Sequence, residues 1–250
     1  MHCADNGIET TESRAEAWDS RSRTLLGDEA CERLANASVA VIGTGGVGGY
    51  AVEALARCGV GNLLIVDADD VAPSNINRQL VALHSTIGQS KVEIFAARCR
   101  DINPKINVKA VKEFVTPDNV AELIGIKIDF VIDAIDTVAP KMAVIAHCLQ
   151  NHIPIISSMG AGGRTDPTKI GYFDISETRE DGLARAVRQR MKKMGLRRSL
   201  KVVASTEPLH RNAVIELEEK NKRSSFGTII TIPSIFGLYL ANHVVMRLIN

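Results

Sequence analysis

The stretch that decides the fold reads Val39-Ala-Val-Ile-Gly43-Thr-Gly45-Gly46-Val-Gly48, an apolar run that leads into a Gly-x-Gly-Gly-x-Gly turn. A short apolar run followed by such a turn is typical of a strand that passes into a helix. Glycines in the turn let backbone N–H groups approach a phosphate, and the helix N-terminus adds a partial positive charge. Alone, the pattern is a weak signal, because dehydrogenases, flavoproteins and ATP-using enzymes share it.

Outward from this turn, apolar runs alternate with amphipathic stretches from residue 38 to residue 158, which is the βαβ signature of a parallel sheet. The near-continuous apolar run 130–135 implies a strand buried on both faces. We therefore predict an α/β fold with a doubly wound, Rossmann-like, mainly parallel sheet and a C-terminal extension of strands and helices. The expected core strands are 38–43, 63–67, 106–111, 130–134 and 154–158, and the expected helices are 46–58, 91–103, 117–124 and 139–151.

The chain changes character after residue 158. Residues 159–227 are expected to form a crossover and a basic substrate-binding segment, with strands at 168–176 and 200–205, a helix at 181–194 and an exposed polar loop at 207–227. Residues 228–250 are expected to form an apolar strand, at 228–232, and a helix. The segment 224–246 is long enough to span a bilayer, but Pro233, Gly237, Asn242 and His243 interrupt it. We therefore favour a buried strand and helix, with membrane association as the less favoured alternative.

Composition is that of an ordinary globular domain. Of the 250 residues, 45% are hydrophobic and 24% are charged, and 30 Lys and Arg face 29 Asp and Glu, so net charge alone indicates no polyanionic partner. Residues 1–17 are polar and acidic and lack the cationic start and apolar stretch of a signal peptide, so we expect a mobile N-terminal tail over 1–20 before a single domain over 21–250. The five cysteines form no Cys-x-x-Cys pair, which offers no zinc site and suits a reducing, cytoplasmic location.

Charged residues follow several of the expected strands. Asp67 and Asp69 end the second strand, Arg78 and Lys91 lie in the connection after it, and Asp136 follows the fourth. In doubly wound sheets, ligands bind beyond the carboxyl ends of the strands, so we expect these groups to converge. A glycine turn that can bind phosphate, together with two cations and several carboxylates, is typical of a site for metal-assisted nucleotidyl transfer.

The chemistry suggests a role for each group. The planar fork of Arg78 can clamp phosphoryl oxygens, Lys91 can neutralise them as a point charge, and Asp136 can hold Mg²⁺. Asp67 can accept hydrogen bonds from a ribose. The alternatives are a turn cluster at Asp69, solvated positions for Arg78 and Lys91, and a helix cap at Asp136.

Six motifs together resemble the ThiF, MoeB and ubiquitin-activating-enzyme superfamily, whose members adenylate a carboxylate with ATP and Mg²⁺. They are Gly43-Thr-Gly-Gly-Val-Gly48, Asp67-Ala-Asp69, Asn75-Ile-Asn77-Arg78-Gln79, Gly88-Gln-Ser-Lys91-Val-Glu93, Ile102-Asn-Pro104 and Asp133-Ala-Ile-Asp136. The resemblance covers residues 21–158 and implies that they form a nucleotide-binding core. It implies a nucleotide site of Gly43, Gly45, Gly46, Gly48, Asp67, Asp69, Asn77, Arg78, Lys91 and Asp136.

Further stretches extend the resemblance over nearly the whole chain, to the tRNA threonylcarbamoyladenosine dehydratases; they are 114–119, 132–137, 153–162, 166–168 and 205–208. This resemblance implies that ATP activates the carboxylate of threonylcarbamoyl-adenosine in tRNA, whose own nitrogen or oxygen then closes a ring. It implies catalytic roles for Arg78, Lys91 and Asp136, with Asp136 as the metal ligand. It also implies a homodimer, with Arg21 supplied across the interface, and leaves room for sulfur-transfer protein partners.

A tRNA substrate requires a cationic surface. On the expected helix 181–194, the basic side chains lie outside the apolar stripe of Leu183, Val187 and Met191, so we expect these side chains to face outward. The alternative is a solvated face without a partner. The candidate tRNA-binding residues are Arg185, Arg188, Arg190, Lys192, Lys193, Arg197 and Arg198.

Three other functions remain as alternatives. Adenylation of a ubiquitin-like sulfur carrier is disfavoured, because activators of such carriers commonly have two Cys-x-x-Cys pairs and a thiol after residue 200, and this chain has neither. An NAD-dependent oxidoreductase would use the glycine turn and Asp67 but leave Arg78, Lys91 and Asp136 idle. A non-catalytic scaffold is least favoured, since none of the charged positions is lost.

Overall fold

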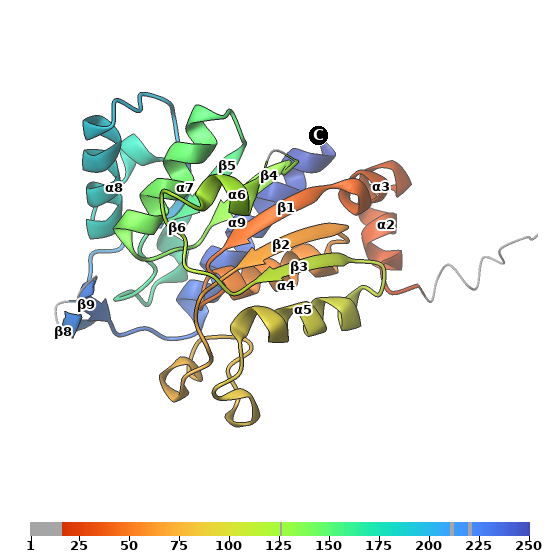
Figure 1. Ribbon diagram of the computed structural model, residues 1–250, viewed down its shortest axis with the longest axis horizontal. Coiled ribbons are helices and arrows are strands. Elements are labelled where there is room, and N and C mark those ends of the chain that lie inside the picture. The colour runs from red at the N-terminus through yellow and green to blue at the C-terminus, as the bar shows by residue number, and fades with distance from the viewer. Residues whose placement is uncertain (1–16, 126, 211–212, 220–221) are drawn as a thin grey trace, which may run out of the picture.

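The computed structural model describes residues 17–125, 127–210, 213–219 and 222–250. Its centre is a seven-stranded sheet with the order β3-β2-β1-β4-β5-β7-β6, in which only β6 runs antiparallel to its neighbour (Figure 1). The predicted doubly wound α/β fold is confirmed. The strands are β1 Ser38–Ile42, β2 Asn62–Val66, β3 Asn107–Val111, β4 Phe130–Asp133, β5 Ile155–Ser158, β6 Ile170–Asp174 and β7 Lys201–Ser205.

Helices cover both faces of the sheet because successive strand residues point to opposite sides. In β1, Val39 and Val41 pack toward α4, α5 and α9, whereas Ala40 and Ile42 pack toward α6, α7 and α8. The helices are α2 Ser20–Leu26, α3 Asp28–Asn36, α4 Gly48–Arg57, α5 Lys91–Ile102, α6 Val120–Ile124, α7 Val138–Gln150, α8 Gly182–Lys193 and α9 Thr231–Ile249. Short 3₁₀ turns lie at η1 Pro73–Asn75, η2 His84–Thr86, η3 Pro167–Lys169 and η4 Ile175–Glu177.

The order of the strands reverses at β1, which pairs with β2 on one side and β4 on the other. The chain leaves β1 toward α4 on one face and leaves β4 toward α7 on the other face. A crevice therefore opens between these connections at the carboxyl ends of the central strands, where doubly wound folds bind their ligands.

The expected strand at 228–232 is wrong, because α9 already begins at Thr231. Pro233 lies in the first turn of this helix, where its missing N–H costs no hydrogen bond. A Cβ on Gly237 would lie 2.3 Å from the carbonyl oxygen of Val47, so glycine allows α9 to pack directly on α4. By length and composition α9 is apolar enough to cross a membrane, but Phe236 and other residues of one face are buried in the core, as expected for a core helix.

Two other boundary predictions change. The expected exposed loop 207–227 contains a two-stranded antiparallel hairpin of β8 Val214–Glu219 and β9 Lys222–Phe226. The charge run in this segment concealed its strand character, since strands are normally recognised by apolar alternation. Residues 1–16 of the expected mobile tail lie outside the described residues, and the end of that tail is helical, because α2 starts at Ser20.

A buried ion pair joins the two central strands to α7. Lys141 is fully buried, and its Nζ atom donates to Asp133 Oδ2 at 2.6 Å, Ser157 Oγ at 3.1 Å and the Ser158 carbonyl oxygen at 2.9 Å. Ser157 Oγ also donates to Asp133 Oδ2, and Asp133 Oδ1 accepts the backbone N–H of Ile135 at 3.1 Å. All three ammonium protons are thus used, and the carboxyl ends of β4 and β5 are held together.

Replacing Lys141 with methionine is expected to lower the free energy of unfolding by about 3–5 kcal/mol, because it leaves Asp133 buried without its cation. Urea denaturation at neutral pH measures the change. Lys193→Met, at an exposed position of α8, is the matched control and is expected to stay within about 0.5 kcal/mol of the parent protein. Equal stabilities of the two variants would contradict the role of the pair.

Candidate active site

A cavity of about 600 Å³ opens at the carboxyl ends of the central strands. One half is lined by residues that the sequence predicted for a nucleotide site: Gly43, Gly45, Gly46, Asp67, Asp69, Arg78, Lys91 and Asp136. The other half is lined by the loop after β5, the start of α8 and the end of β9. Gly48, Asn77 and Arg21, which were also predicted, do not line this cavity.

The glycine turn shapes the first half of the cavity. Gly43 has a φ of +88°, which favours glycine, and a Cβ on Gly48 would lie 1.8 Å from the Gly43 carbonyl oxygen. Gly48 therefore closes the turn and lets α4 start close to the end of β1. Gly45 and Gly46 face the cavity, so the backbone at the N-terminus of α4 is open to an anion.

Asp67 ties the glycine turn to the end of β2. Its Oδ2 atom accepts the backbone N–H of Thr44 at 2.6 Å and the Thr44 hydroxyl at 3.0 Å, while Oδ1 accepts the N–H of Asp69 at 2.9 Å. Each carboxylate oxygen has two lone pairs, so Oδ1 retains acceptor capacity toward the cavity. This geometry is compatible with the ribose contact that the sequence suggested.

Lys91 is a buried cation at the first turn of α5. Its side chain is 4% exposed and its Nζ atom lies 2.8 Å from Oδ2 of Asp69, whose side chain is 71% exposed. Burial of an ammonium is costly without an anionic partner, and Asp69 supplies one. A phosphate in this cavity would lie close to Lys91. The Asp69 carboxylate beside Lys91 is accessible to water.

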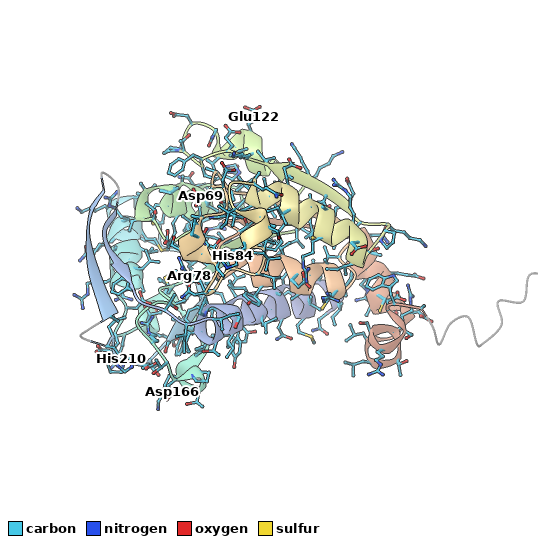
Figure 2. All side chains as sticks on the ribbon, turned by 90° about the horizontal axis from the view of Figure 1, so that it is seen from below. Asp69, Arg78, His84, Glu122, Asp166 and His210 are labelled. Atoms are coloured by element: carbon cyan, nitrogen blue, oxygen red, sulfur yellow. The ribbon has the colours of Figure 1, made fainter. Side chains whose placement is uncertain are left out.

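Arg78 lies at the cavity, and Asn77 holds it there. Arg78 Nη1 donates to the carbonyl oxygen of Ser74 at 2.7 Å and to Asn77 Oδ1 at 2.9 Å. Asn77 Nδ2 in turn donates to the carbonyl oxygen of Thr228 at 3.0 Å. Asn77 therefore positions the Arg78 guanidinium at the cavity, and its own contact with a nucleotide stays a prediction. Figure 2 shows Arg78 and Asp69 in the middle of the molecule, away from Asp166 and His210 at its edge.

Gln79 is a cavity residue that was not among the predicted site residues. It is buried, and its Oε1 atom has no hydrogen-bond partner in the protein. A buried acceptor without a donor is costly, so this atom fits a bound molecule that donates a hydrogen bond. The signal was present in the sequence, because Gln79 completes the Asn-x-Asn-Arg-Gln motif.

Asp136 is exposed at the mouth of the cavity and accepts a hydrogen bond from the Thr137 hydroxyl at 3.2 Å. Across the described residues, no group of three or more His, Cys, Asp or Glu side chains is arranged to hold a metal ion. A divalent cation at Asp136 would therefore take most of its ligands from phosphate oxygens and water, which is how Mg²⁺ commonly binds with nucleotides.

Two predicted arginines lie elsewhere. Arg21 is exposed on α2, which precedes β1 and so lies at the end of the sheet opposite the cavity (Figure 1). Arg188 does not face outward: its Nη1 atom donates to the carbonyl oxygens of Ile175 and Thr178, each at 3.1 Å, and to the Thr178 hydroxyl. Arg188 therefore fastens α8 to the turn before it, and its expected outward position is wrong. The exposed cations of the segment are Arg185, Arg190, Lys192, Lys193, Arg197 and Arg198.

Thiols take no part in this cavity, as far as the described residues extend. Burial raises the pKa of Cys99 and of Cys148 to about 12, and it also raises the pKa of Cys31 and Cys58. A thiol acts as a nucleophile in its thiolate form, so burial lowers the nucleophilic fraction of these four cysteines at neutral pH.

The second half of the cavity is organised by a buried ion pair that the sequence analysis did not identify. Asp181 accepts the N–H of Ala184 at 2.8 Å as the N-cap of α8, and it accepts the N–H of Gly160 at 2.9 Å. Arg164 Nη2 lies 3.4 Å from Asp181 Oδ2 and donates to the carbonyl oxygen of Glu180 at 2.9 Å. Arg164 Nη1 donates to the carbonyl oxygen of Gly160. The loop after β5 is thereby bound to the start of α8.

Comparison with known proteins places the chain in a family. The ThiF family model matches residues 20–250. The tRNA threonylcarbamoyladenosine dehydratase of Bacillus subtilis is 42% identical over 92% of this chain and 94% of its own length, and that of Escherichia coli is 38% identical over 94% and 95%. The E. coli enzyme solved in complex with ATP has a TM-score of 0.84 and covers 93% of this chain and 95% of its own. With most of its length matched by the family model, the chain belongs to the ThiF family.

Proposed function

We propose that this protein is an ATP-dependent dehydratase that cyclises threonylcarbamoyl-adenosine in tRNA by adenylating its carboxylate. The observation that carries the proposal is the convergence of the glycine turn, Arg78 and Lys91 in one cavity at the point where the strand order reverses. The relatives from B. subtilis and E. coli are named for this activity, and their similarity to this chain extends over nearly their full lengths. Adenylation of a sulfur carrier is less well supported, because no cavity thiol among the described residues would receive the activated group.

ATP supplies the leaving group for the reaction: the substrate carboxylate attacks the α-phosphorus, and the bond to pyrophosphate breaks. A nitrogen or oxygen of the same modification then attacks the activated carbonyl carbon, which forms the ring and breaks the bond to AMP. Relative to the starting nucleoside, the product has lost one water, and ATP has become AMP and pyrophosphate. Ring closure within one molecule has a high effective molarity, so an enzyme nucleophile would add little.

The residues around the cavity divide this work. Arg78 and Lys91 neutralise charge on the phosphate oxygens, and the N–H groups at Gly45 and Gly46 cradle them. Asp67 orients the ribose, Gln79 accepts a hydrogen bond through its unpaired oxygen, and the exposed carboxylate of Asp69 gives up Lys91 when a phosphate arrives. Asp136 would hold Mg²⁺, which would neutralise charge on the phosphate oxygens.

We further propose that residues 21–250 act as a single cytoplasmic adenylation domain, with its nucleotide-binding core at 21–158, its crossover and substrate-binding segment at 159–227 and the apolar segment that contains α9 at 228–250. The protein would act as a homodimer through the apolar surface around α9, where Leu238 is 48% exposed and Met246 is 41% exposed. Within one subunit, Arg21 and the cavity lie at opposite ends of the sheet. Arg21 would therefore need a dimer to reach the active site of the partner subunit. A sulfur-transfer protein is a further candidate partner.

The direct test incubates the protein with ATP, Mg²⁺ and tRNA that carries threonylcarbamoyl-adenosine, followed by mass spectrometry of the nucleosides. The modified nucleoside is expected to lose one water, and the loss requires both ATP and Mg²⁺. Pyrophosphate exchange with tRNA or with a ubiquitin-like carrier separates the two adenylation activities. Exchange that depends on the carrier, with no change in the tRNA, would refute the proposal.

Arg78→Ala is expected to reduce turnover by a factor on the order of 10²–10³, because it removes a charged donor from the phosphate oxygens. Arg78→Lys is expected to recover only part of the loss, since an ammonium cannot reproduce the guanidinium fork. Rates of AMP release measure both variants, and circular dichroism verifies their folding. Near-normal turnover of Arg78→Ala would show that the arginine is wrongly assigned.

Reversing the exposed cations Arg190 and Lys193 to glutamate is expected to weaken tRNA binding and to leave ATP affinity unchanged. Each lost phosphate contact lowers the slope of log affinity against log salt by about 0.7–0.9. Filter binding at several salt concentrations measures this slope. The matched control reverses Lys105 and Lys109, which are exposed near β3 at the opposite edge of the sheet. Equal tRNA affinities of the two double variants would exclude α8 from the binding surface.

A further inference from the structure

We infer that the half of the cavity next to α8 binds the base of the substrate nucleoside, which stacks on Phe226 above the glycine-rich loop after β5. The inference rests on the proposed function and deepens it, because it assigns a base-binding subsite to residues outside the nucleotide site. The ligand class is a single-stranded RNA base displaced from its stack.

The floor of this subsite is the loop from Gly160 to Gly163. A Cβ on Gly162 would lie 2.7 Å from Cβ of Phe226, and a Cβ on Gly163 would lie 2.9 Å from Cδ2 of Leu209. Side chains on the loop would therefore push Phe226 and Leu209 away. The small residues Gly160, Ala161 and Gly162 also leave the backbone of the loop accessible to a planar ligand in the cavity.

The loop is held rigidly beneath these side chains. Gly163 donates its N–H to the carbonyl oxygen of Gly227 at 2.8 Å and accepts the N–H of His210 at 3.0 Å. On the other side, Asp181 binds the N–H of Gly160 at 2.9 Å. The subsite is thus built before any ligand arrives, which lowers the entropic cost of binding.

The walls of the subsite are apolar. Leu183 and Ala186 line it from the first turns of α8, and Leu209 and Phe226 line it from the segment that crosses over the sheet. Phe226 remains 36% exposed, although large aromatic side chains are normally buried. An exposed ring at the wall of a cavity is a stacking platform that accepts any nucleobase.

Charge selects RNA as the occupant. The sequence of α8 contains no acidic residue, and Arg185, Arg190 and Lys193 are exposed on the same helix that presents Leu183 and Ala186 to the cavity. At a rise of 1.5 Å per residue, Leu183 and Arg190 are about 10 Å apart along the helix axis. A base in the cavity would therefore have its flanking phosphates close to these cations, as in a single-stranded loop with one base turned out.

The subsite is also correctly placed for the reaction. It opens into the same cavity as Arg78 and Lys91, so a carboxylate attached to the bound base can extend toward the phosphate half. Stacking the base would fix the substrate without using any group that handles the phosphates. We therefore expect changes at Phe226 to affect tRNA recognition separately from ATP binding.

Phe226→Ala is the test, with KM for threonylcarbamoylated tRNA and Kd for ATP as the two readouts in the full-length protein. Loss of one base–aromatic stack is expected to raise KM by a factor on the order of 10–100 while Kd for ATP stays unchanged. Phe226→Tyr is expected to stay within about threefold of the parent protein, because it keeps the ring. Ile87→Ala, at an apolar side chain that is exposed outside the cavity, controls for surface effects.

Binding is followed directly with a fluorescent reporter. The chain has one tryptophan, so the double variant Trp18→Phe/Phe226→Trp carries a single reporter in the subsite. A stem-loop RNA that carries the modified nucleoside in its loop is expected to quench this fluorescence. Polyglutamate, which is also polyanionic but has no base, is not expected to quench it. Equal quenching by polyglutamate would assign the surface to acidic peptides and overturn the inference.

The two proposals fail in different ways. If the parent protein removes no water from the tRNA, the proposed function fails. If the parent protein is active and Phe226→Ala keeps the parent KM for tRNA, only the base-binding subsite fails.

Discussion

The architecture depends on one charge that is completely removed from water. Lys141 reaches from α7 into the end of the sheet, where Asp133 and Ser157 neutralise and saturate it. A buried pair of this kind tolerates no slippage, because any displacement leaves a charge without a partner in a medium of low dielectric. Its geometry therefore fixes the ends of β4 and β5, which lead to Asp136 and to the loop from Gly160 to Gly163 at the cavity.

The two halves of the cavity solve different binding problems with different materials. The half next to the glycine turn presents backbone N–H groups and two cations, Arg78 and Lys91, and such groups suit phosphate oxygens. The half near α8 has apolar side chains and a loop of glycine and alanine, which leave room for a flat ring. Their common border is the loop after β5, which Arg164 and Asp181 bind to the start of α8. A single helix thereby presents an apolar face to the cavity and a cationic face to solvent.

The sequence analysis succeeded where the signal was local. The strand, turn and helix around Gly43–Gly48 and the charged residues that follow β2 and β4 are read from short segments, so their convergence followed from the topology of a doubly wound sheet. It failed at 228–232, because residues 228–230 form no strand and α9, which packs directly on α4, already begins at Thr231. The outward orientation predicted for Arg188 was also wrong, because helical periodicity does not show which side chain will donate a hydrogen bond to a carbonyl oxygen.

The sequence by itself determined the fold class and most of the nucleotide half, because hydrophobic period and glycine spacing are properties of the chain within one or two elements. Only the tertiary structure decided the partners of Lys141, the pairing of Arg164 with Asp181 and the contact between Phe226 and the glycine loop. These contacts join segments from different parts of the chain. The physical reason is that burial and hydrogen-bond saturation depend on which elements pack together, and a single sequence carries no local signal for that.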